Sequence, residues 1–191
     1  RMMDRIPSAT GTQAADVLDF WFADGMHRRW FRPDPDLDAI IRRRFEGLWL
    51  DAAKGKLDAW LDTASGALAL VIVLDQFPLN MFRGRPTAFV TEARAISVSK
   101  AAIVRGFDQH LSEEQVAFLY MPLMHSEAVD DQERSVALFE AAGLEENLRF
   151  ARHHRDLIRR FGRFPHRNRI LGRSSTAEEL AYLASGEAFL G

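Results

Sequence analysis

The stretch ALALVIVL, residues Ala67–Leu74, decides between an all-α and a mixed fold. It is apolar at every position, which places it in the interior of the protein. Its last part, Val71-Ile72-Val73, has the β-branched composition of a buried strand, whereas leucine and alanine dominate its start. Because no other segment shows the alternation that a partner strand needs, we predict a buried central helix here.

The residues that follow, LDQFPLNMFRG, are expected to leave this helix. Pro78 lacks a backbone N–H and Gly84 permits a sharp turn, so we predict an irregular loop bounded by these two residues. Asp75 and Gln76 then end the most apolar helix, where an unpaired carboxylate is costly. We therefore expect Asp75 to pair with one of the many arginines of the C-terminal part.

The rest of the chain reads as amphipathic helices separated by glycine and proline. Expected helices cover residues 14–22, about 34–53 with Asp34-Pro35 as a capped start, 92–105, 112 onward with the capping box Ser112 and Gln115, 130–142, 146–161, and 175 or 176 onward. The helix of residues 146–161 has the cleanest apolar stripe, with Asn147, Phe150, Ala151, His154, Leu157, Ile158 and Phe161. Pro122 should kink or break the helix before it near Met121.

These elements predict an all-α fold of about seven or eight helices with no sheet. We expect one domain over residues 1–191, with residues 1–13 poorly ordered, because a chain of this length buries roughly 70% of its unfolded surface. Short turns between consecutive helices suggest an array of antiparallel α-hairpins, although no clean repeat is present.

Composition narrows the classes of function. The chain has no cysteine, which excludes disulfides, thiolate metal sites and cysteine nucleophiles. Its N-terminus lacks the apolar stretch of a signal peptide, and no apolar run approaches the roughly 18 residues of a membrane helix. We therefore expect a cytoplasmic protein without a membrane segment.

Charge is concentrated near the C-terminus. The net charge is −2, yet residues 149–173 hold nine arginines and a single acid, Asp156. The densest part is RRFGRFPHRNRILGR, Arg159–Arg173. So many cations require either acids folded over them or a bound anion. We interpret this stretch as the lining of a polar pocket.

Five phrases carry a resemblance to a known family. In this order, LDQFPLNMFRG, FLYMPLMHSE, DQERSVALFE, FGRFPHRN and LGRSSTAEE resemble the bacterial family catalogued as domain of unknown function 924. The resemblance runs from about residue 16 to 183 and implies an all-helical fold that is similar to tetratricopeptide repeats. It implies no activity. One departure is Leu79, where the family commonly has arginine.

FGRFPHRN supplies the candidate binding residues. Gly162 lets the chain leave its helix and Pro165 stiffens the turn, so polar side chains project from a fixed loop. Arginine forks suit carboxylate or phosphate. The predicted ligand-binding set is Arg163, His166, Arg167, Asn168, Asp75 and Gln76. The structural alternative is that the arginines pair with acids of neighbouring helices.

The sequence His125-Ser126-Glu127 supplies the catalytic candidates, His125 and Glu127. They share a site only across an irregular turn, because residues two apart face opposite sides of a helix. A histidine oriented by a carboxylate can act as a general base. The alternative role is a helix cap or a link to the arginine loop. His154 is expected to be a buried neutral histidine with one hydrogen bond.

No metal, phosphate-loop or dinucleotide motif is present, so we predict no metal and no cofactor. A metal site without the usual spacing would have to use His125, Glu127, Asp131 and His166. The leading hypothesis is binding of a small anionic molecule, with catalysis left open. The alternative is a helical protein-interaction scaffold. RNA binding is the weakest hypothesis, and it rests on cations interleaved with Phe161 and Phe164.

Overall fold

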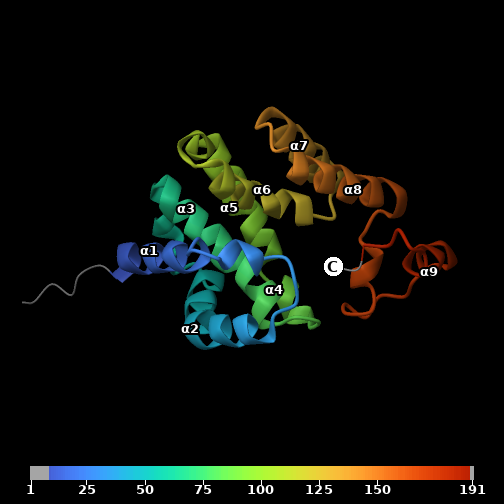
Figure 1. The fold of residues 1–191 in the computed structure, drawn as a ribbon, viewed down its shortest axis with the longest axis horizontal. Helices are drawn as coiled ribbons and strands as arrows, with labels where there is room; N and C mark the ends of the chain where they lie inside the picture. Colours follow the sequence, from blue (N-terminus) through green and yellow to red (C-terminus); the bar gives the residue numbers. More distant parts are fainter. Residues whose placement is uncertain (1–8, 190–191) are drawn as a thin grey trace, which may run out of the picture.

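A computed structural model of the protein describes residues 9–189, with side chains from residue 13 onward. Its α-helices are α1 (Ala9–Trp21), α2 (Pro35–Ala53), α3 (Ala64–Val71), α4 (Phe77–Met81), α5 (Glu92–Val104), α6 (Glu113–His125), α7 (Val129–Ala141), α8 (Glu145–Phe161) and α9 (Ala177–Leu183) (Figure 1). Short 3-10 turns lie between them at η1 (Met26–Arg28), η2 (Asp58–Asp62), η4 (Pro86–Phe89), η5 (Phe107–His110) and η6 (Pro165–Arg167).

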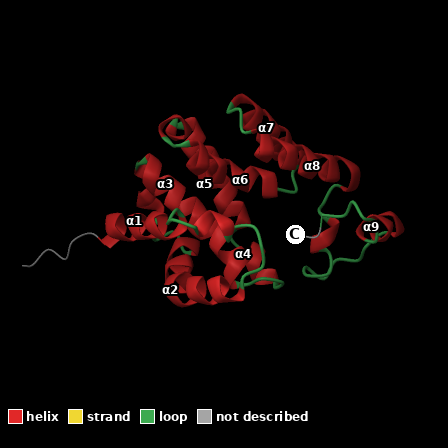
Figure 2. Ribbon diagram, in the orientation of Figure 1, coloured by secondary structure: helices red, strands yellow, loops and turns green. Residues whose placement is uncertain are grey.

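A π-helical turn, η3 (Ile72–Gln76), joins α3 to α4 without a break. The described part of the chain therefore has eight separate helices and no strand, which confirms the predicted all-α class (Figure 2). Of the segment expected to be poorly ordered, residues 1–8 lie outside the described residues, and α1 begins at Ala9.

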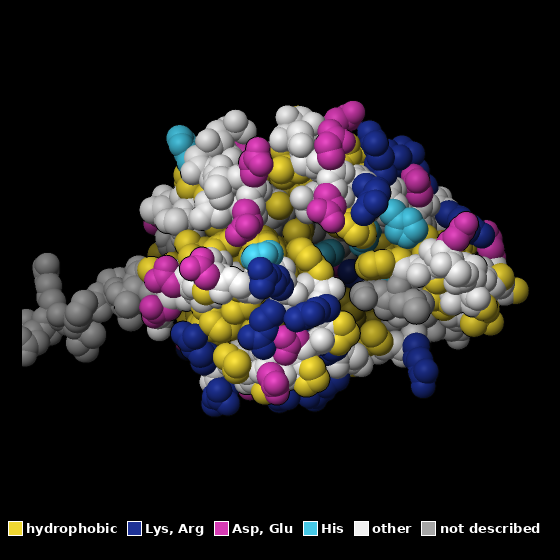
Figure 3. All heavy atoms as spheres, in the orientation of Figure 1, with side chains coloured by type: hydrophobic (Ala, Val, Ile, Leu, Met, Phe, Trp, Pro, Cys, Tyr) yellow, Lys and Arg dark blue, Asp and Glu magenta, His cyan; other side chains and the backbone are white. Residues whose placement is uncertain are grey.

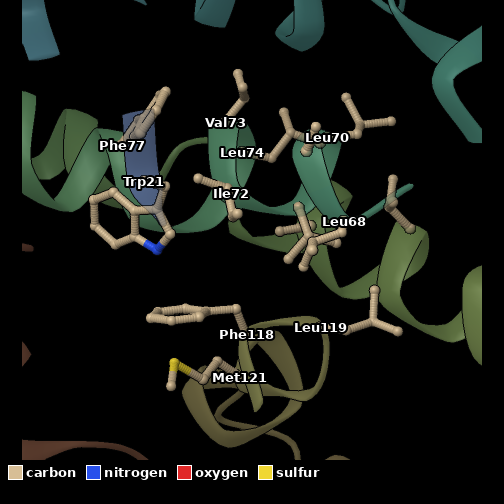
Figure 4. Packing of buried hydrophobic residues seen from close by; sticks show 14 of the residues in the cluster. Trp21, Leu68, Leu70, Ile72, Val73, Leu74, Phe77, Phe118, Leu119 and Met121 are labelled. Atoms are coloured by element: carbon tan, nitrogen blue, oxygen red, sulfur yellow. The ribbon is translucent and has the colours of Figure 1, made fainter. Parts of the chain in front are cut away.

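The helix predicted to be central is central. Every residue from Gly66 to Gln76 is buried. Figure 4 shows side chains of α3 and η3 packed with Trp21 of α1 and with Phe118 and Leu119 of α6. Gly66 is needed for this packing, because a Cβ atom there would collide with the backbone carbonyl of Trp60.

The loop predicted between Pro78 and Gly84 is correct only in its second half, because the helix continues through Pro78 to Met81 and a turn follows from Phe82. In an α-helix the Leu74 carbonyl would accept from the N–H of residue 78, which a proline lacks. The hydroxyl of Thr91 donates to that carbonyl instead, at 2.7 Å. The chain therefore stays helical through Pro78, and a π turn that the sequence did not predict lies just before it, at Ile72–Gln76.

This continuation also changes the prediction about membranes. The combined helix, Ala64–Met81, is long and apolar enough to cross a membrane by length and composition. However, 83% of it is buried inside the fold, as in the core helix of a soluble protein.

Two other predictions about helices need correction. Of the kink or break predicted at Pro122, the break is absent, because α6 runs on to His125. In the turn before the proline, Ser99 donates its hydroxyl to the Leu119 carbonyl at 2.6 Å. In α8 the buried stripe uses Leu148, whereas the predicted Phe150 is 43% exposed.

The buried apolar side chains form two clusters of unequal size. The large cluster draws on α1 to α7 and on the first half of α8. The small one consists of Leu157, Ile158, Phe164 and Tyr182, from the end of α8 and the C-terminal segment. In Figure 1 this segment, with η6 and α9, lies apart from the helical body. Arg167 of the C-terminal segment binds Glu92 and the His125 carbonyl of the helical body, so several of the predicted site residues lie between the two parts.

Candidate functional site

Four elements bring polar side chains to the junction of the two clusters. They are η3, the first residue of α5, the last residue of α6 with the residues after it, and the loop of residues 162–173. On the face shown in Figure 3 the surface is hollowed there, with histidine side chains inside the hollow and hydrophobic ones at its rim. Small-molecule sites are often found at such interfaces between packed units.

At the centre of the junction lies a pair formed by His125 and Asp75. Nδ1 of His125 donates to Asp75 Oδ1 at 2.9 Å, and the amide of Gln76 donates to Asp75 Oδ2 at 3.0 Å. The Asp75 side chain is 3% exposed and that of His125 is 21% exposed. Burial lowers the pKa of His125, but the charges of Asp75 and Glu92 raise it, and the net effect is a raised pKa. His125 therefore stays protonated to a higher pH than an isolated histidine.

The second pair is Arg167 with Glu92, which borders the first. The guanidinium of Arg167 donates to both carboxylate oxygens of Glu92, at 3.1 and 2.9 Å, and to the backbone carbonyl of His125 at 2.8 Å. It lies 4.5 Å from the ring centroid of Phe89 and 4.9 Å from that of Phe164. Its Nε is buried without a partner in the described structure. Burial raises the pKa of Glu92 although Arg167 opposes the change.

The third pair ties the arginine loop to the residues after α6. Arg173 donates to both oxygens of Glu127, at 2.8 and 2.9 Å, and the backbone N–H of Phe164 adds a bond to Glu127 at 2.9 Å. Arg173 also donates to Asn168 Oδ1 at 2.9 Å. Burial raises the pKa of Glu127, but these hydrogen bonds lower it, and the net pKa is below the usual value. Glu127 is therefore held as a carboxylate.

The fourth pair lies within the C-terminal segment. Arg163 donates to both oxygens of Glu179, at 3.0 and 2.8 Å, and to the carbonyl of Ser174 at 2.7 Å. The amide of Asn168 donates to Glu179 at 3.0 Å. Glu179 also forms the capping box of α9 with Thr176. Arg163 and Asn168 thus hold α9 against the loop.

Two neutral histidines surround the ring of Phe189. His154 lies 4.7 Å and His166 5.0 Å from it, between ring centroids. Burial lowers the pKa of His154 to about 3, and its Nδ1 donates to the Phe150 carbonyl at 2.7 Å. This agrees with the prediction of a buried neutral histidine with one hydrogen bond. Burial also lowers the pKa of His166 to about 4, and its Nδ1 is buried without a partner in the described residues.

The structure divides the predicted residues into two groups. Asp75, Gln76, His125 and Arg167 come together, with His166 next to Arg167 in the chain, whereas Arg163, Asn168 and Glu127 face other partners. Asp75 pairs with a histidine and not with the expected arginine. The carboxylate that orients His125 is Asp75, because Glu127 binds Arg173.

Sequence reasoning missed Glu92 and Thr91. Glu92 was recognised only as the start of a helix, and its partner Arg167 is 75 residues away. The pattern of the chain carries no signal for a pair this distant. A surplus of arginine in one stretch indicated that acids had to be near, without saying which ones.

The alternative metal site is not assembled among the described residues. No group of three histidine or acidic side chains there could hold a metal ion. Asp131 instead binds Lys100 at 2.6 Å and Ser126 at 2.7 Å. Two shallow depressions, of about 560 and 350 Å³, lie elsewhere, on the outer face of α2 and between α1 and the start of α3, and no predicted site residue lines them.

Comparison with known proteins identifies relatives but no activity. A family model described as "Bacterial protein of unknown function (DUF924)" matches residues 17–187. A solved structure of a protein of unknown function from Agrobacterium tumefaciens is 42% identical, with a TM-score of 0.89, and the match covers 93% of this chain and 99% of that one. A search of curated proteins gave no match.

Proposed function

Because the chain belongs to the bacterial family DUF924, whose description names no activity, we propose a function from its geometry: it binds a small anionic molecule, a carboxylate or a phosphate, at His125. The observation that carries this proposal is the His125–Asp75 pair. A buried carboxylate fixes Nδ1, whereas Nε2 makes no hydrogen bond within the described part of the chain and the ring is partly exposed. Such a ring presents one oriented donor to a ligand.

The surroundings of His125 favour an anion. Each nearby acid already has a cationic partner: Asp75 has His125, Glu92 has Arg167, and Glu127 has Arg173. An incoming anion therefore meets N–H donors instead of free carboxylates. The Nε of Arg167, which is buried without a partner, is a second donor in the same region.

The π turn gives independent support. Such turns are rare and are found frequently at functional sites. Here the turn carries both Asp75 and Gln76, the two residues on which the orientation of His125 depends. In its neutral form, His125 would present the Nε2 lone pair as a general base held in one tautomer by Asp75, so the same geometry permits acid–base catalysis.

The experiment follows the His125 ring by NMR in isotopically labelled protein. Inorganic phosphate, acetate and succinate are added separately, with ionic strength kept constant by sodium chloride. We expect at least one of the three to shift the ring signals of His125 saturably and to raise the melting temperature. His125→Asn should abolish the rise in melting temperature, whereas His110→Asn, at an exposed histidine, should keep both the rise and the shift of the His125 signals.

A response that survives His125→Asn, or no response to any of the three probes, would refute the proposal. The second outcome would favour the scaffold alternative. That alternative has one specific support: Arg163 and Arg173 are fully engaged in holding the C-terminal segment, as structural residues would be. RNA binding has less support, since Arg159 and Arg160 of α8 already face Glu133 and Glu178.

A further inference from the structure

We infer that Thr91 is a positioning residue, which keeps the π turn η3 in place so that Asp75 meets His125. This role of Thr91 matters for function only if the proposed function holds, on which it rests. The hydrogen bonds that define the role do not depend on a ligand. The hydrogen bonds of the Thr91 side chain go to Trp49 and to the Leu74 carbonyl, and not to either member of the pair. Thr91 acts on the backbone of the turn that carries Asp75.

The hydroxyl of Thr91 is the middle of a buried chain of hydrogen bonds. Nε1 of Trp49 donates to Thr91 Oγ1 at 3.0 Å, and Thr91 in turn donates to the Leu74 carbonyl at 2.7 Å. Thr91 is 4% exposed, so water does not readily replace these bonds. The carbonyl in question is the one that Pro78 leaves without its α-helical donor. The hydroxyl of Thr91 thus gives the Leu74 carbonyl the donor that Pro78 cannot supply.

The register of the helix explains why this atom matters. A π turn inserts one residue into the helix, and each residue turns the helix by about 100° because there are about 3.6 residues per turn. Conversion of η3 to a regular α-helical turn would rotate Asp75 relative to α4 by that amount. The 2.9 Å contact between Asp75 and His125 would not survive such a rotation.

The neighbour of Thr91 links the same segment to the second pair. Glu92 follows directly in the chain and binds Arg167, which donates to the His125 carbonyl. Two adjacent residues at the start of α5 therefore hold both sides of His125. The side chain of Thr91 fixes the turn that bears Asp75, the carboxylate partner of His125. The side chain of Glu92 fixes Arg167, which binds the backbone carbonyl of His125.

The test compares Thr91→Val with Thr91→Ser. Valine keeps the shape and removes the hydroxyl, whereas serine keeps the hydroxyl. The readout is the NMR titration of His125, whose charged neighbours are Asp75, Glu92 and Arg167. We expect the pKa of His125 to fall in Thr91→Val towards or below its ordinary value of 6.5 and to stay raised in Thr91→Ser. A folded Thr91→Val variant with an unchanged titration would overturn the inference.

A second variant keeps the test decisive if Thr91→Val does not fold. Pro78→Ala restores the missing N–H, which can then close the α-helical bond to the Leu74 carbonyl. We expect this variant to fold, to lose the π turn and to lower the pKa of His125. Thr91→Val added to it should then have little further effect on the titration, because the carbonyl already has a donor. Simple addition of the two effects would contradict the inference, whereas a native titration in Pro78→Ala would show that the hydroxyl of Thr91 holds the turn even against the restored donor.

The titration separates this inference from the proposed function, because it needs no ligand. If Thr91→Val lowers the pKa of His125 while the native protein binds neither phosphate, acetate nor succinate, the role of Thr91 is supported and the proposed function fails. If the native protein binds a probe and a folded Thr91→Val variant titrates normally, only the inference fails.

Discussion

His125 and His154 are both largely buried, yet their pKa values move in opposite directions. His154 faces aromatic rings and one backbone carbonyl, so burial dominates and keeps it neutral. Burial also lowers the pKa of His125, but the adjacent carboxylate of Asp75, with a smaller contribution from Glu92, outweighs it. The difference lies mainly in one neighbour, Asp75. The contact with Asp75 therefore contributes most to the raised pKa of His125.

Asp75→Asn should reverse the behaviour of His125. Without the carboxylate, burial and Arg167 both lower its pKa, which should fall below the ordinary value. The raised pKa stabilises the native protein below pH 6.5, and this contribution is lost as the pH rises through the folded value. The variant should lack it and lose about 1–3 kcal/mol of unfolding free energy at pH 6. NMR titration and urea unfolding measure both effects.

Asp58→Asn is the matched control for this change, because Asp58 forms an exposed pair with Arg94. It should alter stability by less than about 1 kcal/mol and leave the His125 titration as it was. An Asp75→Asn protein in which His125 still titrates above pH 6.5 would show that another group holds the proton there.

The lowered pKa of His154 predicts that the free energy of unfolding decreases in acid. It binds a proton in the unfolded chain near pH 6.5 but in the native state only near pH 3. Stability should therefore fall as the pH drops between these values, by up to about 1.4 kcal/mol per pH unit for this one site. Urea unfolding of His154→Leu at pH 7, 5 and 4 should show a shallower decline than the native protein. His110→Gln should leave the decline unchanged, and equal slopes in all three proteins would refute the assignment.

At the level of elements, signals between neighbours in the chain were read correctly and contacts between distant segments were not. The N-cap Asp34, the capping box of Ser112 and Gln115, and the stop at Gly162 depend on residues within one turn, and all are present. The loop predicted from Pro78 begins only after Met81, and Pro122 does not break its helix. Hydroxyls from α5 or the residue before it support those helices, and no local pattern reveals them.

The same division applies to the candidate site. The arginine loop was found because its charge and its glycine and proline are visible in one short stretch. Its acids come from three other elements, so only their existence was predictable. The pairing of His125 with Asp75 depends on the π turn, whereas the sequence predicts only that Asp75 and Gln76 end a helix there.

Glu179→Gln should weaken the attachment of α9. The hydrogen bonds from Arg163 lower the pKa of Glu179 to about 2, so its contribution is complete above pH 4.5 and is lost as the pH falls towards 2. We expect a loss of about 1–3 kcal/mol at pH 7, which shrinks as the native carboxylate becomes protonated. Guanidinium unfolding at pH 7 and pH 3 tests this. Glu178→Gln, at the exposed pair with Arg160, should change little, and equal losses in the two variants would contradict the assignment.

The whole molecule combines a large apolar core with a small one, and the contact between them includes the charged pairs of the site. The small cluster contains four buried apolar side chains, too few to hold a segment firmly without further ties. Those ties are the bonds of Arg167 and Arg173 to the helical body. Local opening should therefore begin at the C-terminal segment and expose His125 before the central helix is affected.

Arg173→Ala tests this order of opening. The change leaves the half-buried Glu127 carboxylate with only the Phe164 N–H as partner, and removal of one member of a buried ion pair costs about 3–5 kcal/mol at most. We expect hydrogen–deuterium exchange to quicken at least tenfold over residues 163–189, with α3 and α5 unchanged. Arg159→Ala removes an exposed pair with Glu133 on the outer side of α8 and should leave this pattern as in the native protein. Uniform acceleration of exchange throughout the chain would mean that both clusters open together. The charged pairs would then lie inside one cooperative unit, and not at the boundary where the protein opens first.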